Sequence, residues 1–251
     1  MAGLHGAMPW AAMAAVFVLA GVVKGVIGLG LPTLSMALLA LWMAPAEAAA
    51  LLILPSLLTN VWQVRPWATA WPLLRRLGGM QLGICAGTLA GARAFGAPAG
   101  AGATVLLGVA LLAYAGWGLA GRTLRLAPGH ERWLGPVVGA ATGVVTAATG
   151  VFVVPAVPYL QALGLQRDGL VQAMGLSFTT STVVLAVALA GEGGYSHAAL
   201  GGSLAMLLPA LAGMALGQWA RQRLSAAVFR RCFFVGLALL GAYMLARQGW
   251  R

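Results

Sequence analysis

Acidic residues are scarce in this sequence: four Asp and Glu occur among 251 residues, against fifteen Lys and Arg. Charged residues make up only 8% of the chain, whereas soluble domains carry roughly 25%. Hydrophobic residues make up 61%, and apolar runs of about 18 or more residues recur along most of the chain. This composition excludes a soluble globular domain and predicts an all-α polytopic membrane protein.

Cysteine and histidine are also scarce, and they form no metal-site pattern. The two cysteines, Cys85 and Cys232, are far apart and match no metal or redox spacing. The three histidines are isolated from one another. The apolar runs contain no serine–histidine elbow and no paired carboxylates, and the glycine-rich GVIGLG has no preceding strand to make a nucleotide site. We therefore expect no catalytic residue, no metal, no cofactor and no enzymatic activity.

The net charge of +11 comes mainly from arginines in the short connections between the apolar runs. Such residues set the orientation of membrane spans, so they do not indicate a nucleic-acid partner. If the two Gly/Pro-interrupted runs fold back as hairpins, eleven arginines share one side: Arg65, Arg75, Arg76, Arg122, Arg125, Arg132, Arg167, Arg221, Arg223, Arg230 and Arg231. Only Arg93, Arg247 and Arg251 lie opposite. This bias predicts that the larger group is cytoplasmic.

The two halves of the chain resemble each other at an offset of about 120 residues. The stretch GVVKGVIGLGLP from Gly21 corresponds to GVVTAATGVFVVP from Gly143, and SLLTN from Ser56 corresponds to SFTTS from Ser177. We predict a single membrane domain over residues 1–251, with repeat one at 10–120, a linker at 121–132 and repeat two at 133–247.

Each repeat is predicted to contain a Gly/Pro-broken helical hairpin followed by three transmembrane helices. The hairpins are expected at 10–42 and 133–164. The remaining helices are expected at 46–64, 72–91, 102–120, 168–190, 198–220 and 228–247. With this topology the halves cross the membrane in opposite directions, as inverted repeats.

The two breaks are the first candidate site. Gly28 and Gly30 permit backbone angles that other residues resist, and Pro32 suits the first turn of a new helix. That helix start presents unpaired N–H groups and the positive end of its dipole, which together attract anions. The first break contributes Gly28, Leu29, Gly30, Pro32 and Thr33 as candidate substrate-binding residues. The second break contributes Thr146, Thr149, Gly150 and Pro155.

Lys24 is the only basic residue well inside an apolar run. A charge at the bilayer centre costs about 2.5–3.5 kcal/mol even on the mildest scale. Lys24 therefore reaches water by extending to the interface, becomes neutral, or meets an anion that comes and goes. Its counterpart in the second half, Thr146, is uncharged, so the site is expected to be only pseudo-symmetric.

Matched polar patches add a third group of candidates: Asn60 in the first half, and Ser177 and Ser181 in the second. Amide and hydroxyl groups donate to oxyanions without adding charge, which suits weak and reversible binding. The alternative is ordinary hydrogen bonding between helices, worth about 0.6 kcal/mol on average. Their recurrence in both halves favours the binding site.

These stretches resemble the TauE/SafE sulfite exporter family, also called the toluene sulfonate uptake permease family. The residues that carry the resemblance are AGVVKGVIGLGLPTLSMALLAL, PAEAAALLILPSLLTNVWQ and the weaker GVVTAATGVFVVPAVPYLQALGL in the second half. The resemblance spans both halves. It implies a multi-pass protein of the bacterial inner membrane that moves sulfite, organosulfonates or related small anions.

The sequence therefore predicts a secondary transporter, used for export, that binds a small oxyanion at broken-helix N-termini near the bilayer centre. An anion channel and a membrane accessory subunit without transport of its own remain alternatives. The expected partners are the small anionic substrate and the lipid bilayer. The sequence leaves open a coupling proton or sodium ion, association into oligomers, and the identity of the anion.

Overall fold

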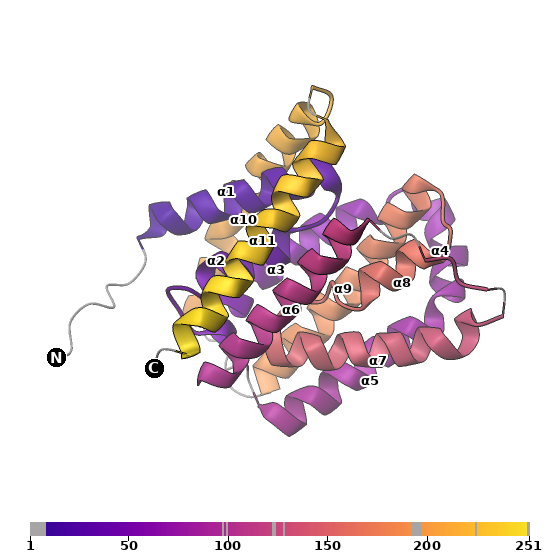
Figure 1. Ribbon diagram of the computed structural model, residues 1–251, viewed down its shortest axis with the longest axis horizontal. Helices are drawn as coiled ribbons and strands as arrows, with labels where there is room; N and C mark the ends of the chain where they lie inside the picture. Colours follow the sequence, from indigo (N-terminus) through magenta and orange to yellow (C-terminus); the bar gives the residue numbers. More distant parts are fainter. Residues whose placement is uncertain are drawn as a thin grey trace.

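The computed structural model describes residues 9–96, 98, 100–121, 124–127, 129–191, 197–223 and 225–249. Over these residues it contains eleven α-helices and no strand (Figure 1). The helices are α1 (Trp10–Ile27), α2 (Leu31–Leu39), α3 (Pro45–Gln63), α4 (Trp67–Arg76), α5 (Gly78–Phe95), α6 (Gly100–Ala120), α7 (Glu131–Thr149), α8 (Ala156–Ala162), α9 (Arg167–Gly191), α10 (His197–Ala220) and α11 (Ala226–Gly249).

Six of the described helices are long and apolar enough to cross a bilayer: α1, α3, α6, α9, α10 and α11. Their length and composition confirm the prediction of an all-α, multi-pass membrane protein.

Both predicted helix breaks are present. The helix α1 ends at Gly28, whose φ is 78°, and α2 begins after Gly30, whose φ is 105°. These left-handed angles are easily reached only by a residue without a Cβ atom. In the second half, α7 ends at Gly150 with φ 70°, and α8 begins after Pro155. The glycines therefore stop each first helix inside an apolar run.

After each break the chain turns back on the helix that it has just left. A Cβ atom at Gly30 would lie 2.6 Å from Cγ1 of Val23, so the start of α2 packs against α1. The hydroxyl of Tyr159 in α8 donates to the carbonyl oxygen of Glu131, the first residue of α7, at 3.5 Å. These contacts give each broken run the folded-back form of a hairpin.

The predicted helix at 72–91 is wrong, because two helices occupy this region. The helix α4 ends before Leu77, and α5 begins at Gly78. Only Ala70 of α4 is buried, while Trp67 and Trp71 are 57% and 59% exposed. A short helix with exposed indoles and two terminal arginines fits an amphipathic segment at a membrane surface rather than a span.

Glycines at four-residue spacing bring two pairs of parallel helices into backbone contact, because small residues let helix backbones approach closely. Between α1 and α10, a Cβ atom at Gly213 would lie 2.1 Å from the carbonyl oxygen of Val18. One turn further along both helices, Gly217 stands in the same way against Val22, at 2.2 Å. Between α5 and α7, Gly87 faces the carbonyl oxygen of Ala140 at 2.1 Å.

Two other helix pairs are antiparallel. Along α3 and α9, Gly175 packs against Gln63, whereas Nδ2 of Asn60 donates to Oγ1 of Thr182 at 3.4 Å. Between these two contacts the residue number falls from Gln63 to Asn60 in α3 and rises from Gly175 to Thr182 in α9, so the two helices run in opposite directions. Along α6 and α11, Gly108 meets Leu245, while Gly118 meets Phe234. The helices that hold equivalent places in the two predicted repeats, α3 with α9 and α6 with α11, thus run in opposite directions.

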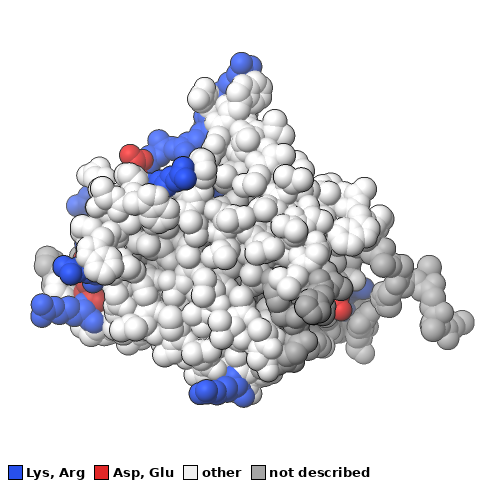
Figure 2. Space-filling model, turned by 180° about the vertical axis from the view of Figure 1, so that it is seen from behind, with Lys and Arg blue, Asp and Glu red and all other residues white. Residues whose placement is uncertain are grey.

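Seven of the eleven arginines that were predicted to share one membrane side line two cavities. Four of them line one cavity and three line a second: Arg65, Arg167, Arg221 and Arg230, then Arg75, Arg76 and Arg132. Arg247, predicted on the opposite side, donates instead to the carbonyl oxygen of Leu41 at 3.2 Å. Figure 2 shows basic side chains gathered along the upper left of that view, with a broad white surface between them and smaller patches at the opposite edges. Arg122 and Arg251 lie outside the described residues.

Candidate functional site

Lys24 lies in the last turn of α1 and is only 3% exposed. Its ammonium donates to Oγ1 of Thr59 at 2.9 Å and to Oδ1 of Asn60, both buried on α3. The hydroxyl of Thr59 in turn donates to the carbonyl oxygen of Pro55 at 2.6 Å, which leaves its oxygen free to accept from the lysine. The structure therefore places Lys24 and Asn60, two separate candidates of the sequence analysis, in direct contact.

Neutral oxygens hold this ammonium. Among the described residues the recorded ion pair is that of Arg76 with Glu131, and it does not involve Lys24. A positive charge on Lys24 would thus be buried without a carboxylate of the described residues beside it, which is costly in a membrane interior. An anion from solution is the partner that would relieve this cost.

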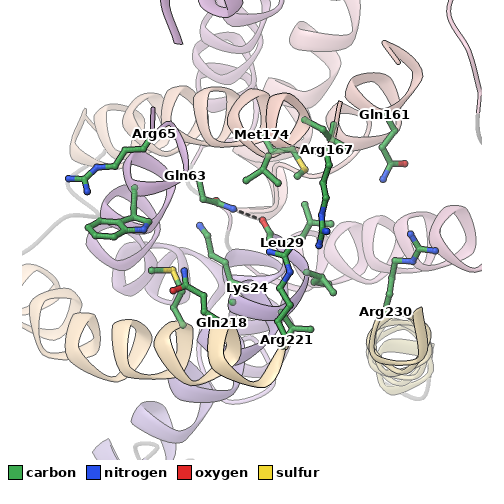
Figure 3. A pocket seen from close by; sticks show the side chains of 18 of the residues that line it. Lys24, Leu29, Gln63, Arg65, Gln161, Arg167, Met174, Gln218, Arg221 and Arg230 are labelled. Atoms are coloured by element: carbon green, nitrogen blue, oxygen red, sulfur yellow. Dashed lines mark hydrogen bonds between the residues drawn. The ribbon is translucent and has the colours of Figure 1, made fainter. Parts of the chain in front are cut away.

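A cavity of about 550 Å³ opens beside Lys24 (Figure 3). The residues from Lys24 to Leu29 form one wall, Gln63 lies on α3, Val171 and Met174 on α9, and Gln218 on α10. Four arginines complete the lining: Arg65, Arg167, Arg221 and Arg230. Within the part of the chain that the structure describes, no acidic side chain lines the cavity. In Figure 3 the side chains of Arg167 and Arg221 point toward the break at Leu29, whereas that of Arg65 points away.

Gln63 of α3 forms a hydrogen bond with the first helix break. Its Nε2 donates to the carbonyl oxygen of Gly28 at 2.8 Å, so the backbone oxygen left free at the end of α1 has a partner. Its Oε1 is buried and has no hydrogen-bond partner. Gln63 was not predicted, although it lies one helical turn beyond Asn60, on the same face of α3.

The start of α2 lies on the far side of the break from the cavity. Gly28 and Leu29 line the cavity, but Gly30, Pro32 and Thr33 do not. Gly30 caps α2, accepting from the amide of Leu34 at 2.7 Å. The hydroxyl of Thr33 is fully buried and has no partner.

The candidates of the second break are buried elsewhere. The hydroxyl of Thr146 donates to the carbonyl oxygen of Thr142 at 2.7 Å, and that of Thr149 accepts from the amide of Val151 at 3.1 Å. A Cβ atom at Gly150 would lie 2.8 Å from the terminal carbon of Met36, so this break packs against α2. Neither these residues nor Pro155, which caps α8, line the cavity.

The polar patch on α9 faces α5 rather than Lys24. The hydroxyl of Ser177 accepts from Nε2 of Gln81 at 3.0 Å, and the hydroxyl of Ser181 is buried without a partner. Neither serine lines the cavity. The structure therefore brings together Lys24, Gly28, Leu29 and Asn60, and keeps the second-half candidates apart from them.

The arginines of the cavity were interpreted from sequence only as orientation signals, so their place at the site was missed. Each occupies a helix end or a connection, and the fold brings these ends to one opening. A guanidinium group presents forked donors that suit oxyanions. The group of Arg65 also lies 4.2 Å from the ring centroid of Trp62, another lining residue.

Fold and site together define a multi-pass membrane protein with a cationic cavity beside a broken helix. The chain matches the family model described as "Sulfite exporter TauE/SafE" over residues 13–244. It belongs to this family, which indicates membrane transport of sulfur-containing anions. No curated protein and no solved structure matched the chain.

Proposed function

We propose that this protein is a secondary transporter that exports a small sulfur oxyanion, such as sulfite or an organosulfonate. The observation that carries the proposal is the buried amino group of Lys24, which donates to neutral oxygens beside a cavity where the described lining includes four arginines and no acid. Such a site is electrostatically incomplete until an anion binds.

In the proposed complex the anion approaches the end of the cavity at Lys24. The ammonium and the guanidinium groups of Arg167 and Arg221 attract it, and the side-chain amide of Gln218 offers a neutral donor. A volume of about 550 Å³ falls within the range of small-molecule sites. It has room for sulfite with its water or for a larger sulfonate.

We infer that the two halves are inverted repeats. The antiparallel course of α3 with α9 and of α6 with α11 supports this, because repeats in the same orientation would place equivalent helices parallel. The parallel pairs support it too: α10 packs on Val18 and Val22 of α1, and α5 packs on Ala140 and Val144 of α7. Val18 and Val22 of α1 lie about 120 positions before Ala140 and Val144 of α7, so the two packed pairs are equivalent in the two repeats.

At the end of α11 away from the Lys24 cavity, a cavity of about 400 Å³ is lined by Leu41, Ala101 and Arg247. Helices α5, α7 and α9 enclose only about 10 Å³ between Ala92, Ala147, Leu185 and Leu189. That space is at the limit of what one water needs. The described residues thus leave an open, basic cavity beside Lys24 and almost no space between α5, α7 and α9, and alternating access would require the latter place to open.

During transport the cavity beside Lys24 would close, and the space between α5, α7 and α9 would open. The cavity opens among arginines that are predicted to be cytoplasmic, so this state would load from the cytoplasm, as export requires. In the opposite state the buried and unpartnered hydroxyls of Thr33 and Ser181 would gain a partner by facing the anion. Thr146, Thr149, Gly150, Pro155 and Ser177 would line that second opening.

Counterflow in proteoliposomes tests the proposal. Vesicles preloaded with unlabelled sulfite should accumulate labelled sulfite transiently and with saturation. A Lys24→Met variant should not, because it loses the deep charge. Flux without counterflow would indicate an anion channel, and no flux from correctly folded protein would indicate an accessory subunit. The same vesicles with a proton or sodium gradient identify any coupling ion.

A further inference from the structure

A second basic cavity, of about 420 Å³, lies where α4 ends and α5 and α7 begin. Arg75 and Arg76 of α4, Glu131 and Arg132 of α7, and Tyr159 of α8 contribute to its lining. It shares no lining residue with the cavity beside Lys24. The transport site therefore does not account for it.

One arginine of this cavity is already paired. Arg76 binds Glu131 through two hydrogen bonds, of 2.8 and 2.5 Å. The guanidinium holds the pKa of the Glu131 carboxyl below its usual value, so the carboxylate stays charged. Arg75 and Arg132 take no part in the ion pair recorded for the described residues. The cavity thus retains two positive charges that the protein does not neutralise.

The surroundings of this cavity are those of a membrane surface. The guanidinium of Arg75 lies 5.1 Å from the ring centroid of Trp71, and Trp133 at the start of α7 is 58% exposed. About one turn further along α5 and α7, Leu82 and Val137 are 72% and 58% exposed. Tryptophan and arginine next to exposed aliphatic side chains are typical of the level of lipid headgroups.

We propose that this cavity binds the phosphate of an anionic phospholipid. Arg75 and Arg132 come from different helices, α4 and α7, so one phosphate between them would join the surface helix to the α5–α7 pair. A zwitterionic headgroup fits less well, because its own cation would meet arginines. Basic pockets between helices at the cytoplasmic surface suit anionic headgroups for this reason.

Native mass spectrometry of the purified, full-length protein tests the site, with phosphatidylglycerol, phosphatidylcholine or inorganic phosphate added. We expect the wild type to retain phosphatidylglycerol. The Arg75→Gln/Arg132→Gln variant should bind it at least about tenfold more weakly. Arg223→Gln is the matched control, because Arg223 stands over Trp219 at 4.4 Å but does not line the cavity. Its retention of the lipid should equal that of the wild type.

Three results would overturn the proposal. These are equal retention of phosphatidylcholine, full retention of phosphatidylglycerol by the double variant, and displacement of the lipid by millimolar inorganic phosphate, which would make this a small-anion site. Both substituted arginines are exposed, and an unchanged gel-filtration profile shows that the variant folds. Loss of this site would leave the transport proposal untouched, since counterflow tests the other cavity.

Discussion

The ammonium of Lys24 on α1 lies 2.9 Å from the hydroxyl oxygen of Thr59 on α3, and both side chains are buried. The amide oxygen of Asn60 accepts a second hydrogen bond from the same ammonium. These contacts orient a charge that they cannot neutralise, because both acceptors are uncharged. This arrangement supports the proposal of an anion that binds and leaves, rather than a permanent ion pair.

An internal carboxylate beside Lys24 should compete with the substrate. We expect Asn60→Asp to fold, since the new charge lies against the ammonium, and to bind sulfite at least about tenfold more weakly. Isothermal titration measures this. Thr180→Val is the control, because that hydroxyl donates to the carbonyl oxygen of Leu176 and is not at the cavity. Normal affinity in Asn60→Asp would mean that the anion does not meet Lys24.

Cross-linking the helices around the small space between α5, α7 and α9 should stop transport without stopping binding. In a background with Cys85→Ala and Cys232→Ala, cysteines at Ala92 and Ala188, which line the small space between α5, α7 and α9, should allow cross-linking. The cross-linked protein should still bind sulfite from the arginine-lined side but show no counterflow. Each single cysteine variant, treated alike, should transport normally. Undiminished counterflow after complete cross-linking would rule out opening at this place.

The glycine contact between α1 and α10 should be essential for stability. At Gly217 a methyl group would lie 2.2 Å from the carbonyl oxygen of Val22, and neither backbone can yield without parting the helices. We expect Gly217→Ala to lower the melting temperature by several degrees, at about 2–4 °C per kcal/mol. Gly236→Ala in α11 should be neutral or stabilising, because an added Cβ atom would meet no neighbouring atom within 4 Å there. Equal effects would contradict the close packing.

The pair of Arg76 and Glu131 should give a small stability that depends on pH. Because the pKa of Glu131 is lower in the folded protein than in the unfolded chain, the contribution is present near neutral pH. It is lost as the pH falls below about 4, through the lowered pKa. Since the pair is partly exposed, we expect about 0.2–1 kcal/mol at pH 7.

Thermal unfolding of Glu131→Gln against the wild type, at pH 7 and pH 3, measures this difference. Glu47→Gln controls for the loss of a carboxylate from a first helical turn, because Glu47 has that position in α3 without an ion pair recorded for it. A wild-type advantage that persists unchanged at pH 3 would show that the carboxylate charge is not its source.

Much of the fold follows from the sequence, because long apolar runs and Gly/Pro breaks act locally. The ends at Gly28 and Gly150 are set by residues that reach left-handed angles, so both breaks were predicted. The division at Leu77 was not, although Gly78 and Gly79 follow it, because Leu73, Leu74 and Leu77 flank the arginines of α4 and continue the apolar pattern.

The site was predicted only in part, because its contacts join residues far apart in sequence. Lys24 was recognised by the cost of a buried charge, and Asn60 by its recurrence with Ser181. The roles of Arg167 and Arg221 depend on how the ends of α9 and α10 meet, which no local pattern encodes. For the same reason Thr146 and Ser177, which look equivalent to site residues, lie outside the open cavity.

The most direct test of the account is a titration of sulfite into purified wild-type protein and a Lys24→Met variant, which keeps the length of the side chain and removes its charge. The account predicts saturable binding to the wild type, and binding weaker by more than about tenfold in a variant that elutes and melts like a folded protein. Equal affinity in the two proteins would contradict it.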